Sequence, residues 1–278
     1  PIAMDNEELT LFRDMAHRAL EAEISPYIEQ WEAQHSVPRQ LWHTLGQAGL
    51  LCPDMPEEYG AAGTTPEVTF AVIEEMSRLS FGGIASGYSI HSNIVAPYIE
   101  HFGTEEQKSQ WLPKMVTGEA LGALAMTEPS AGSDVQSIRA KAVKDGDEWI
   151  LNGSKIFITN GMLADIVIVA AITDPGKGAK GTSLFIVDAT LPGFARGKKI
   201  EKMGQHTSDT AELFFQDVRL PASSLLGELN KGFVIMMTEL PRERLGIAAQ
   251  AIAAAEGALD ITVDYVLERK AFGQTIAR

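Results

Sequence analysis

Glu243 is the side chain of this sequence best placed to accept a proton. It stands between Arg242 and Arg244 in "TELPRERLG", residues 238–246, in a stretch with helical character. A glutamate there either solvates the helix surface or faces the interior, where desolvation raises its pKa above the usual value of about 4.3. A carboxyl group with a raised pKa suits removal of a proton from a weakly acidic carbon. Both interpretations stay open at the level of the sequence.

Helical geometry separates Glu243 from the two arginines that flank it. On a helix, Leu240, Glu243 and Ile247 share one face at i, i+3 and i+7. The arginines project about 100° to either side, so they do not automatically neutralise the carboxylate. We therefore predict a carboxylate on an apolar face, near the start of a helix or just beyond a kink made by Pro241.

A second segment with chemical potential is "AMTEPSAGSDV", residues 125–135. It combines small hydroxyl residues, a proline and a glycine in a turn that leads toward β structure. Such a turn can point backbone N–H groups into a nest for phosphate oxygens, although taken alone an ordinary polar loop is the simpler interpretation. By contrast, "GKGAKG", residues 176–181, has the glycine spacing of a dinucleotide-binding loop but precedes a strand-like "TSLFIV", which predicts a hairpin.

Composition excludes several classes of protein. The formal net charge of −14 over 278 residues argues against a nucleic-acid partner, because phosphate backbones require a basic face. The single Cys52 leaves no internal disulfide and no cysteine-rich metal site, and we expect it to be buried. The histidines are not spaced as metal ligands, so we predict no metal. Charged residues interrupt the most apolar stretch, so we predict no membrane span.

The hydrophobic pattern divides the chain into three parts. Helical periodicity runs to about residue 122, and short runs with a period of two follow, separated by turn residues. The helical period then returns near residue 230. We predict an α+β protein with an N-terminal α-helical domain (1–122), a middle antiparallel β domain (123–227) and the start of a truncated C-terminal α-helical domain (228–278).

Local signals place two helix starts and one helix face. Thr65 followed by Pro66 is typical of an N-cap and a first-turn proline, and Thr104 with Gln107 forms a capping box. In the last helical part, one apolar stripe is expected to face the core: Ala248, Ile252, Ala255, Leu259, Val263 and Val266.

Three motifs, in order along nearly the whole chain, resemble the acyl-CoA dehydrogenase family. The segment at 125–135 resembles its flavin loop, T-E-P-x-A-G-S-D, and "NGSKIFITNG" resembles its second flavin strand. "ERKAFGQTI" resembles the helix end that reaches a neighbouring subunit's FAD. "DTAELFFQDVRLPASSLLGELNKGF" and "ELPRERL" look most like the long-chain branch, with the isovaleryl branch next. Phe157 stands where many members have tryptophan, and Ser130 where many have glycine.

The resemblance implies FAD as the cofactor and assigns roles to residues. Those implied to bind the flavin are Leu124, Ala125, Met126, Thr127, Gly132, Ser133, Phe157, Ile158, Thr159 and Arg269, the last serving the partner subunit's FAD. Those implied to bind substrate are Ser133, Val234, Pro241, Arg242 and Arg244. The resemblance implies Glu243 as the catalytic base, which many other members place in a later C-terminal segment.

The activity implied is oxidation of a saturated acyl-CoA to a trans-2-enoyl-CoA in fatty-acid β-oxidation. The resemblance further implies electron-transfer flavoprotein as acceptor, a homotetramer built as a dimer of dimers, and additional helices beyond residue 278. The implied location is the cytoplasm of a bacterium or the mitochondrial matrix of a eukaryote. Two alternatives stay open: an acyl-CoA oxidase or other flavin enzyme of the superfamily, and a non-catalytic partner subunit of the same fold.

Overall fold

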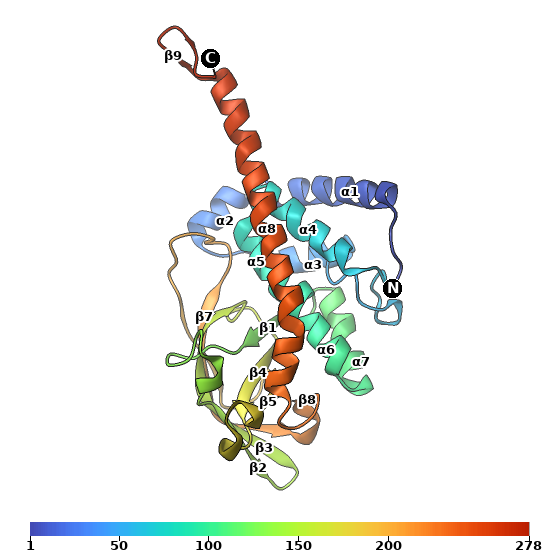
Figure 1. Ribbon diagram of the computed structural model, residues 1–278, viewed down its shortest axis with the longest axis vertical. Helices are drawn as coiled ribbons and strands as arrows, with labels where there is room; N and C mark the ends of the chain where they lie inside the picture. The colour runs from blue at the N-terminus through green and yellow to red at the C-terminus, as the bar shows by residue number, and fades with distance from the viewer. Residues whose placement is uncertain (278) are drawn as a thin grey trace.

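The computed structural model describes residues 1–277. It places a layer of helices against a twisted β domain, with one long helix running alongside both and projecting beyond them (Figure 1). The helices of the first layer are α1 (Asn6–Ile24), α2 (Ile28–Gln34), α3 (Arg39–Gln47), α4 (Pro66–Arg78), α5 (Gly82–Tyr88), α6 (Ala96–Phe102) and α7 (Glu105–Val116). A π-helical segment, η2 (Ser89–Val95), joins α5 to α6, and a 3₁₀ turn, η1 (Glu57–Tyr59), precedes α4.

The β domain is one sheet in the order β6-β7-β3-β2-β4-β5-β8, with β1 added beside β4. Its strands are β1 (Gly122–Ala125), β2 (Lys141–Asp145), β3 (Glu148–Thr159), β4 (Ile166–Ile172), β5 (Thr182–Asp188), β6 (Phe194–Lys199), β7 (Thr210–Pro221) and β8 (Leu225–Leu226). Short 3₁₀ turns lie between them: η3 (Val135–Ser137), η4 (Pro175–Gly181) and η5 (Ala222–Ser224). The turn η4 joins the antiparallel pair β4 and β5, so the hairpin predicted for "GKGAKG" is confirmed.

The sheet is largely antiparallel, as predicted, but β4 has parallel neighbours. Gly122 to Ala125 of β1 pair in parallel with Ile166 to Val169, and β2 meets β4 in parallel at Lys141 and Ile172. Parallel pairing needs a long connection, and here a loop and the β2–β3 hairpin separate β1 from β4.

Strand β4 is buried on both faces because alternate side chains enter two different cores. Ile166 and Ile168 belong to the core shared with the helices, whereas Val167 and Val169 belong to a second core on the other face of the sheet. Cys52 lies fully buried in the first core, and burial raises the pKa of its thiol to about 12. The two cores hold β1, and the loop that follows it, at the junction of the layers.

The long helix α8 (Gly232–Glu268) contacts the helical layer through small residues. A Cβ atom at Gly246 would lie 2.5 Å from Asn93 Nδ2, and one at Gly257 would lie 2.1 Å from the carbonyl oxygen of Arg78. At Gly257 the neighbour is the backbone of α4, and only glycine permits so close an approach, whereas at Gly246 the neighbour is a side-chain amide. The residues of α8 that are buried recur at helical spacing: Gly232, Ile235, Met236, Glu239, Glu243, Gly246, Ala253 and Gly257.

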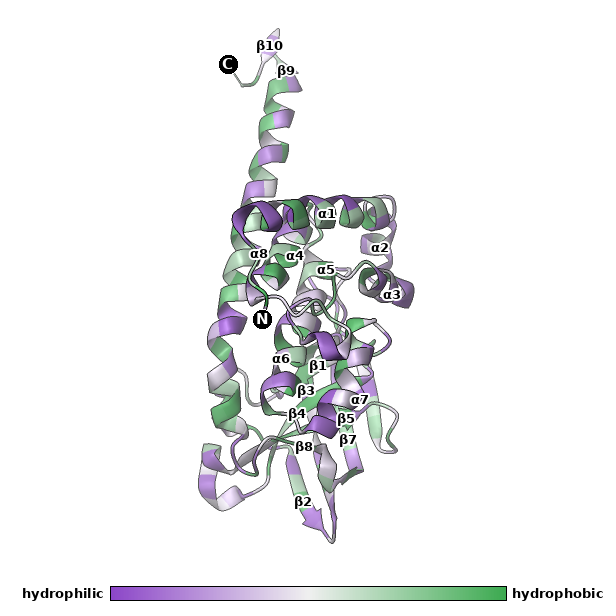
Figure 2. Cartoon of the chain, turned by 90° about the vertical axis from the view of Figure 1, so that its right-hand side faces the viewer, coloured by the Kyte–Doolittle hydropathy of each residue, from purple (hydrophilic) through white to green (hydrophobic). Residues whose placement is uncertain are grey.

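Two expectations about the faces of α8 were wrong. The stripe through Ile252 and Leu259 is exposed, and so is Ile247, at 63% of its surface. Figure 2 shows hydrophobic and hydrophilic residues alternating along the part of α8 that projects beyond the other helices. Large apolar side chains dominate the sequence pattern, whereas the contact with α4 is made by the small residues. Pro241 is exposed and lies inside α8, which continues through it as one helix.

By length and composition, α8 is the one helix within residues 1–277 that is apolar enough to cross a bilayer. Most of its apolar window is exposed. Its first half, however, carries three charged side chains, Glu239, Arg242 and Glu243, which contact α6 and neighbouring segments. Charged side chains are costly to place inside a bilayer. The absence of a membrane span therefore stays a prediction.

Candidate active site

Two segments that stand far apart in the sequence lie side by side: the loop after β1 and the C-terminal part of β3. The Ile156 N–H donates to the Thr127 carbonyl at 3.0 Å, and the Thr127 hydroxyl donates back to the Ile156 carbonyl. The ladder between β3 and β7 changes register between Lys155 and Ile158. Within this bulge Phe157 has φ +59° and a side chain that is 62% exposed. The bulge thus presents an aromatic ring beside the loop that follows β1.

A buried ion pair fixes this loop, residues 126–134, to the sheet. The Lys155 ammonium donates to the Met126 carbonyl at 2.9 Å and to Glu128 Oε1 at 2.8 Å. Glu128 also accepts the backbone N–H groups of Arg139 and Ala140 at 2.6 and 3.0 Å. Burial lowers the pKa of Lys155, and the Glu128 carboxylate opposes that shift. With its charges matched and its carboxylate satisfied, the pair holds the backbone of the loop in one place.

A cavity of about 320 Å³ separates the 126–134 loop from the first turns of α8. Met126 and Ser133 line it from the loop, and Glu243 lines it from the helix. Its other lining residues are Asp134, Val135, Gln136, Phe233, Met236, Met237, Leu240 and Arg244. An apolar wall rich in methionine therefore faces a short polar segment, which includes Asp134, and the Glu243 carboxylate stands on the helix beside that wall.

Glu243 faces the interior, as predicted, and is only 8% exposed. The fully buried Tyr98 on α6 donates its hydroxyl to Glu243 Oε1 at 2.9 Å. Burial raises the pKa of Glu243, the Tyr98 hydrogen bond acts in the opposite direction, and the charge of Glu239 raises it further. A carboxyl group with a raised pKa thus borders the cavity, with one of its oxygens already bonded.

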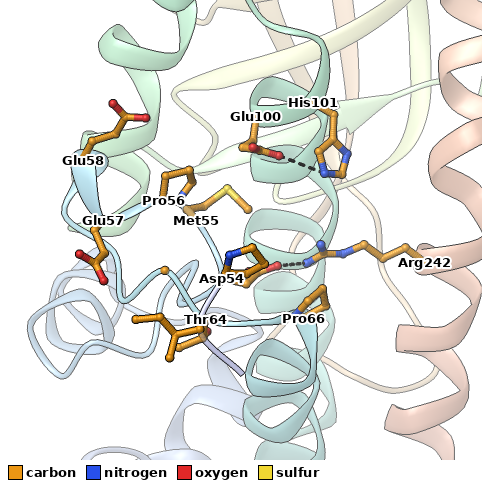
Figure 3. A pocket seen from close by; sticks show the side chains of 13 residues that line it. Asp54, Met55, Pro56, Glu57, Glu58, Thr64, Pro66, Glu100, His101 and Arg242 are labelled. Carbon is orange, nitrogen blue, oxygen red and sulfur yellow. Dashed lines mark hydrogen bonds and ion pairs between the residues drawn. The ribbon is translucent and has the colours of Figure 1, made fainter. Parts of the chain in front are cut away.

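The two arginines that flank Glu243 lie in different cavities, because they project to different sides of α8. Arg244 lines the same cavity as Glu243. Arg242 donates to Asp54 at 2.5 Å and to Asn93 Oδ1 at 3.0 Å, on the wall of a separate cavity of about 530 Å³ (Figure 3). Arg242 is therefore occupied by a buried carboxylate and does not reach the first cavity.

The remaining residues assigned to the flavin lie around the same loop. Leu124 packs against the first core, and Ala125 and Ile158 lie inside the second. Thr159, at the end of the bulged strand, pairs with Thr210 of β7. Gly132 is exposed, and a Cβ atom there would meet nothing within 4 Å. The loop backbone at Gly132 therefore borders open space.

Besides Arg242, three further residues predicted to bind ligands lie away from the cavity: Val234, Pro241 and Arg269. Val234 and Pro241 are exposed and do not line it. Arg269 caps α8 at the opposite end of the helix, beside the small hairpin β9 (Lys270–Ala271) and β10 (Gln274–Thr275) (Figure 1). Its exposure at that tip is compatible with a role toward another subunit.

Sequence reasoning missed the apolar wall of the cavity. Phe233, Met236, Met237 and Leu240 follow one another at i, i+3, i+4 and i+7, and Arg244 continues this face at i+11. That spacing is visible in the sequence and could have identified these residues. Over residues 1–277 no group of histidine, cysteine, aspartate or glutamate side chains is arranged to hold a metal ion.

Comparison with known proteins identifies the family. The acyl-CoA dehydrogenase N-terminal, middle and C-terminal domain models match residues 6–119, 123–218 and 230–278. The long-chain specific acyl-CoA dehydrogenase of Rattus norvegicus mitochondria is 49% identical over 274 residues, which cover 98% of this chain and 63% of that protein. The mitochondrial isovaleryl-CoA dehydrogenase of Pongo abelii is 39% identical, over 98% of this chain and 65% of that protein.

The fold agrees with that of a solved structure over nearly the whole of this chain. A glutaryl-CoA dehydrogenase from Mycobacterium smegmatis, in complex with FADH2, superposes with a TM-score of 0.91 at 32% identity, covering 99% of this chain and 69% of that one. The chain spans less than two thirds of the length of these two curated relatives. Three consecutive domain matches and this shared fold show that the chain belongs to the acyl-CoA dehydrogenase family.

Proposed function

We propose that this chain carries the active site of an FAD-dependent acyl-CoA dehydrogenase that converts a saturated acyl-CoA thioester into a trans-2-enoyl-CoA. One observation carries the proposal: a buried carboxylate, Glu243, faces Met126 and Ser133 of the 126–134 loop across a cavity of about 320 Å³. Removal of hydrogen from two adjacent carbons needs a base on one side and an acceptor on the other. The cavity offers space for a thioester between them.

The residues around the loop fit FAD. Phe157 exposes an aromatic face next to Thr127, and Ser133 brings a hydroxyl to the cavity wall. The open side of Gly132 leaves the loop backbone accessible. Met126, Thr127, Ser133, Phe157 and Thr159 would hold the cofactor of this subunit, and Arg269 would contact that of a partner subunit. Bound FAD supplies the acceptor for the hydride that leaves the β-carbon.

The work of the protein itself centres on the α-proton. The hydrogen on the carbon next to a thioester carbonyl is only weakly acidic. A base removes it more effectively when the pKa of that base is raised above its usual value. Burial of Glu243 provides such a shift. The surrounding Phe233, Met236 and Leu240 exclude water from the carboxylate and offer apolar contact to an acyl chain. Arg244 borders the same cavity, where a cation can stabilise the charge that develops on the thioester oxygen.

The activity is tested by mixing the FAD-loaded protein with saturated acyl-CoA thioesters of increasing length in the absence of oxygen. We expect loss of the oxidised-flavin absorption together with formation of an enoyl-CoA. Readmission of oxygen should reoxidise the flavin only slowly, whereas an electron-transfer flavoprotein should do so quickly. A rapid reaction with oxygen would instead favour an acyl-CoA oxidase, and a protein that binds no flavin would contradict the proposal.

Assembly and location follow the family in this proposal. We infer electron-transfer flavoprotein as the acceptor and a homotetramer, arranged as a dimer of dimers, as the working form. The exposed Arg269 at the tip of α8 supports a role toward a neighbouring subunit. We further propose domain boundaries at residues 1–122, 123–227 and 228–278. A bacterial cytoplasm or a mitochondrial matrix is the expected location.

The hydroxyl groups of Thr127 and Ser133 should contribute to flavin affinity. Replacing both by alanine should weaken FAD binding by roughly 1–3 kcal/mol if two buried hydrogen bonds are lost. The Thr127 hydroxyl already donates to the Ile156 carbonyl. The single variant Thr127→Ala therefore also tests whether this hydrogen bond is needed to hold the loop against β3. Titration of the flavin-free variants with FAD measures the effect. Unchanged affinity in the double variant would mean that the loop acts through its backbone alone.

A further inference from the structure

Helix α6 presents two polar side chains to α8. Tyr98 and His101 stand three residues apart on α6, and Glu239 and Glu243 stand four residues apart on α8, so each pair shares one helix face. The Tyr98 hydroxyl donates to Glu243 Oε1 at 2.9 Å, and His101 Nδ1 lies 2.7 Å from Glu239 Oε1. Each buried carboxylate of α8 therefore has one partner on α6.

The contact between Tyr98 and Glu243 is shielded from water. Tyr98 is fully buried, and Glu239 and Glu243 are 6% and 8% exposed. A hydroxyl in such a place must find its partner within the protein, and the Glu243 carboxylate is the acceptor it has. The bond occupies Oε1 and leaves Oε2 as the second oxygen of a carboxylate that borders the cavity.

We propose that Tyr98 is a positioning residue for the base: it holds Oε1 of Glu243 and so presents Oε2 to the α-hydrogen of the substrate, while His101 holds Glu239 one helical turn away. This inference rests on the proposed function, since it concerns the base of that reaction. A tethered carboxylate loses less rotational freedom on reaching the reactive geometry than a free one, and small errors of position are costly in rate.

The polar and charged groups around Glu243 shift its pKa in different directions, and this makes the inference testable. Tyr98 faces Glu243 from α6 and Glu239 and Arg244 from α8, while Asp134 lines the same cavity from the 126–134 loop. Glu100, His101 and Arg242 line the separate cavity, where Arg242 pairs with Asp54. The Tyr98 bond stabilises the carboxylate and lowers the pKa of Glu243, whereas the charge of Glu239 raises it. Removal of these two groups should therefore move the ionisation of the base in opposite directions.

The decisive variant is Tyr98→Phe, which removes one hydroxyl and keeps the ring. The pKa of Glu243 should rise, because its carboxylate loses a hydrogen-bond donor. Glu239→Gln should lower the pKa of Glu243, because a like charge is removed. Infrared spectroscopy of the Glu243 carboxyl over a pH series reads this ionisation without turnover, and Glu243→Gln identifies its band. The rate of flavin reduction over the same pH series should follow, with Tyr98→Phe at least about tenfold slower on the acidic side.

Tyr88→Phe is the matched control. Tyr88 is as buried as Tyr98, and its hydroxyl donates to the Leu50 carbonyl at 2.7 Å instead of to a carboxylate. This variant should leave both pH profiles in place. If the infrared titration of Tyr98→Phe matches the unsubstituted protein, the positioning role is overturned and the proposed function is untouched. If that titration moves while the rate profile does not, Glu243 is not the base: the positioning role is overturned, whereas the measured flavin reduction still supports the proposed dehydrogenation.

Discussion

Glu243→Gln should slow flavin reduction by acyl-CoA about 10²- to 10⁴-fold, the range typical for loss of a general base. Glutamine keeps the shape of the side chain and can still accept the Tyr98 hydrogen bond, so the fold and FAD binding should be retained. It cannot accept a proton from carbon. Rapid mixing under anaerobic conditions measures the reduction step itself, which separates this loss from effects on product release or reoxidation.

Glu256→Gln is the matched control for that measurement. It makes the same chemical change on the same helix, but Glu256 is exposed and pairs with Arg78 on α4. Reduction in this variant should stay close to the unsubstituted rate. Arg242 is less suitable as a control, since its loss would leave the buried Asp54 unpaired. Reduction of Glu243→Gln within a few-fold of the unsubstituted rate would place the base elsewhere.

Lys155→Met should destabilise the protein by about 3–5 kcal/mol, because it leaves the buried Glu128 carboxylate without its counter-charge. The same substitution frees the Met126 carbonyl, so the 126–134 loop should lose its fixed position and FAD should bind more weakly. Urea unfolding monitored by circular dichroism gives the first effect, and titration with FAD gives the second.

Two comparisons isolate the buried pair. Arg219 on β7 pairs with Asp145 and Glu148, and the side chains of all three are at least 43% exposed, so Arg219→Met should leave the unfolding midpoint nearly unchanged. Adding Glu128→Gln to Lys155→Met should recover part of the stability, since the amide is neutral and its single oxygen can still accept one of the two N–H groups, from Arg139 or from Ala140. A midpoint in Lys155→Met no lower than in Arg219→Met would contradict a structural role for the ion pair.

Local signals in the sequence predicted several features correctly because their causes are local. Helix α4 begins at Pro66 with Thr65 as N-cap, and α7 begins after Thr104 with both bonds of the capping box formed. The same holds for the interior position of Glu243, which follows from its spacing relative to Leu240. Such features depend on residues within one or two helical turns.

The partners of Glu243 could not be predicted in this way. Tyr98 lies 145 residues earlier in the chain, and nothing in its neighbourhood marks its hydroxyl as a donor to a carboxylate. Prediction of the buried face of α8 failed for a related reason. Apolar side chains show which surface prefers to be covered, whereas glycines show where another backbone comes close, and here the contact with α4 follows the glycines.

Gly246 and Gly257, the glycines at which α8 closely contacts other segments, also couple the position of its far end to that of Glu243. Gly257 meets the backbone of α4 about four turns beyond Glu243, or roughly 20 Å along the axis. A helix is stiff over that length, so a change in spacing at the far contact tilts the whole rod about its remaining contacts. The orientation of the Glu243 carboxylate therefore depends partly on the contact at Gly257, far from the cavity. We therefore expect substitutions at Gly246 or Gly257 to change the orientation of the Glu243 carboxylate, although neither glycine lines the cavity.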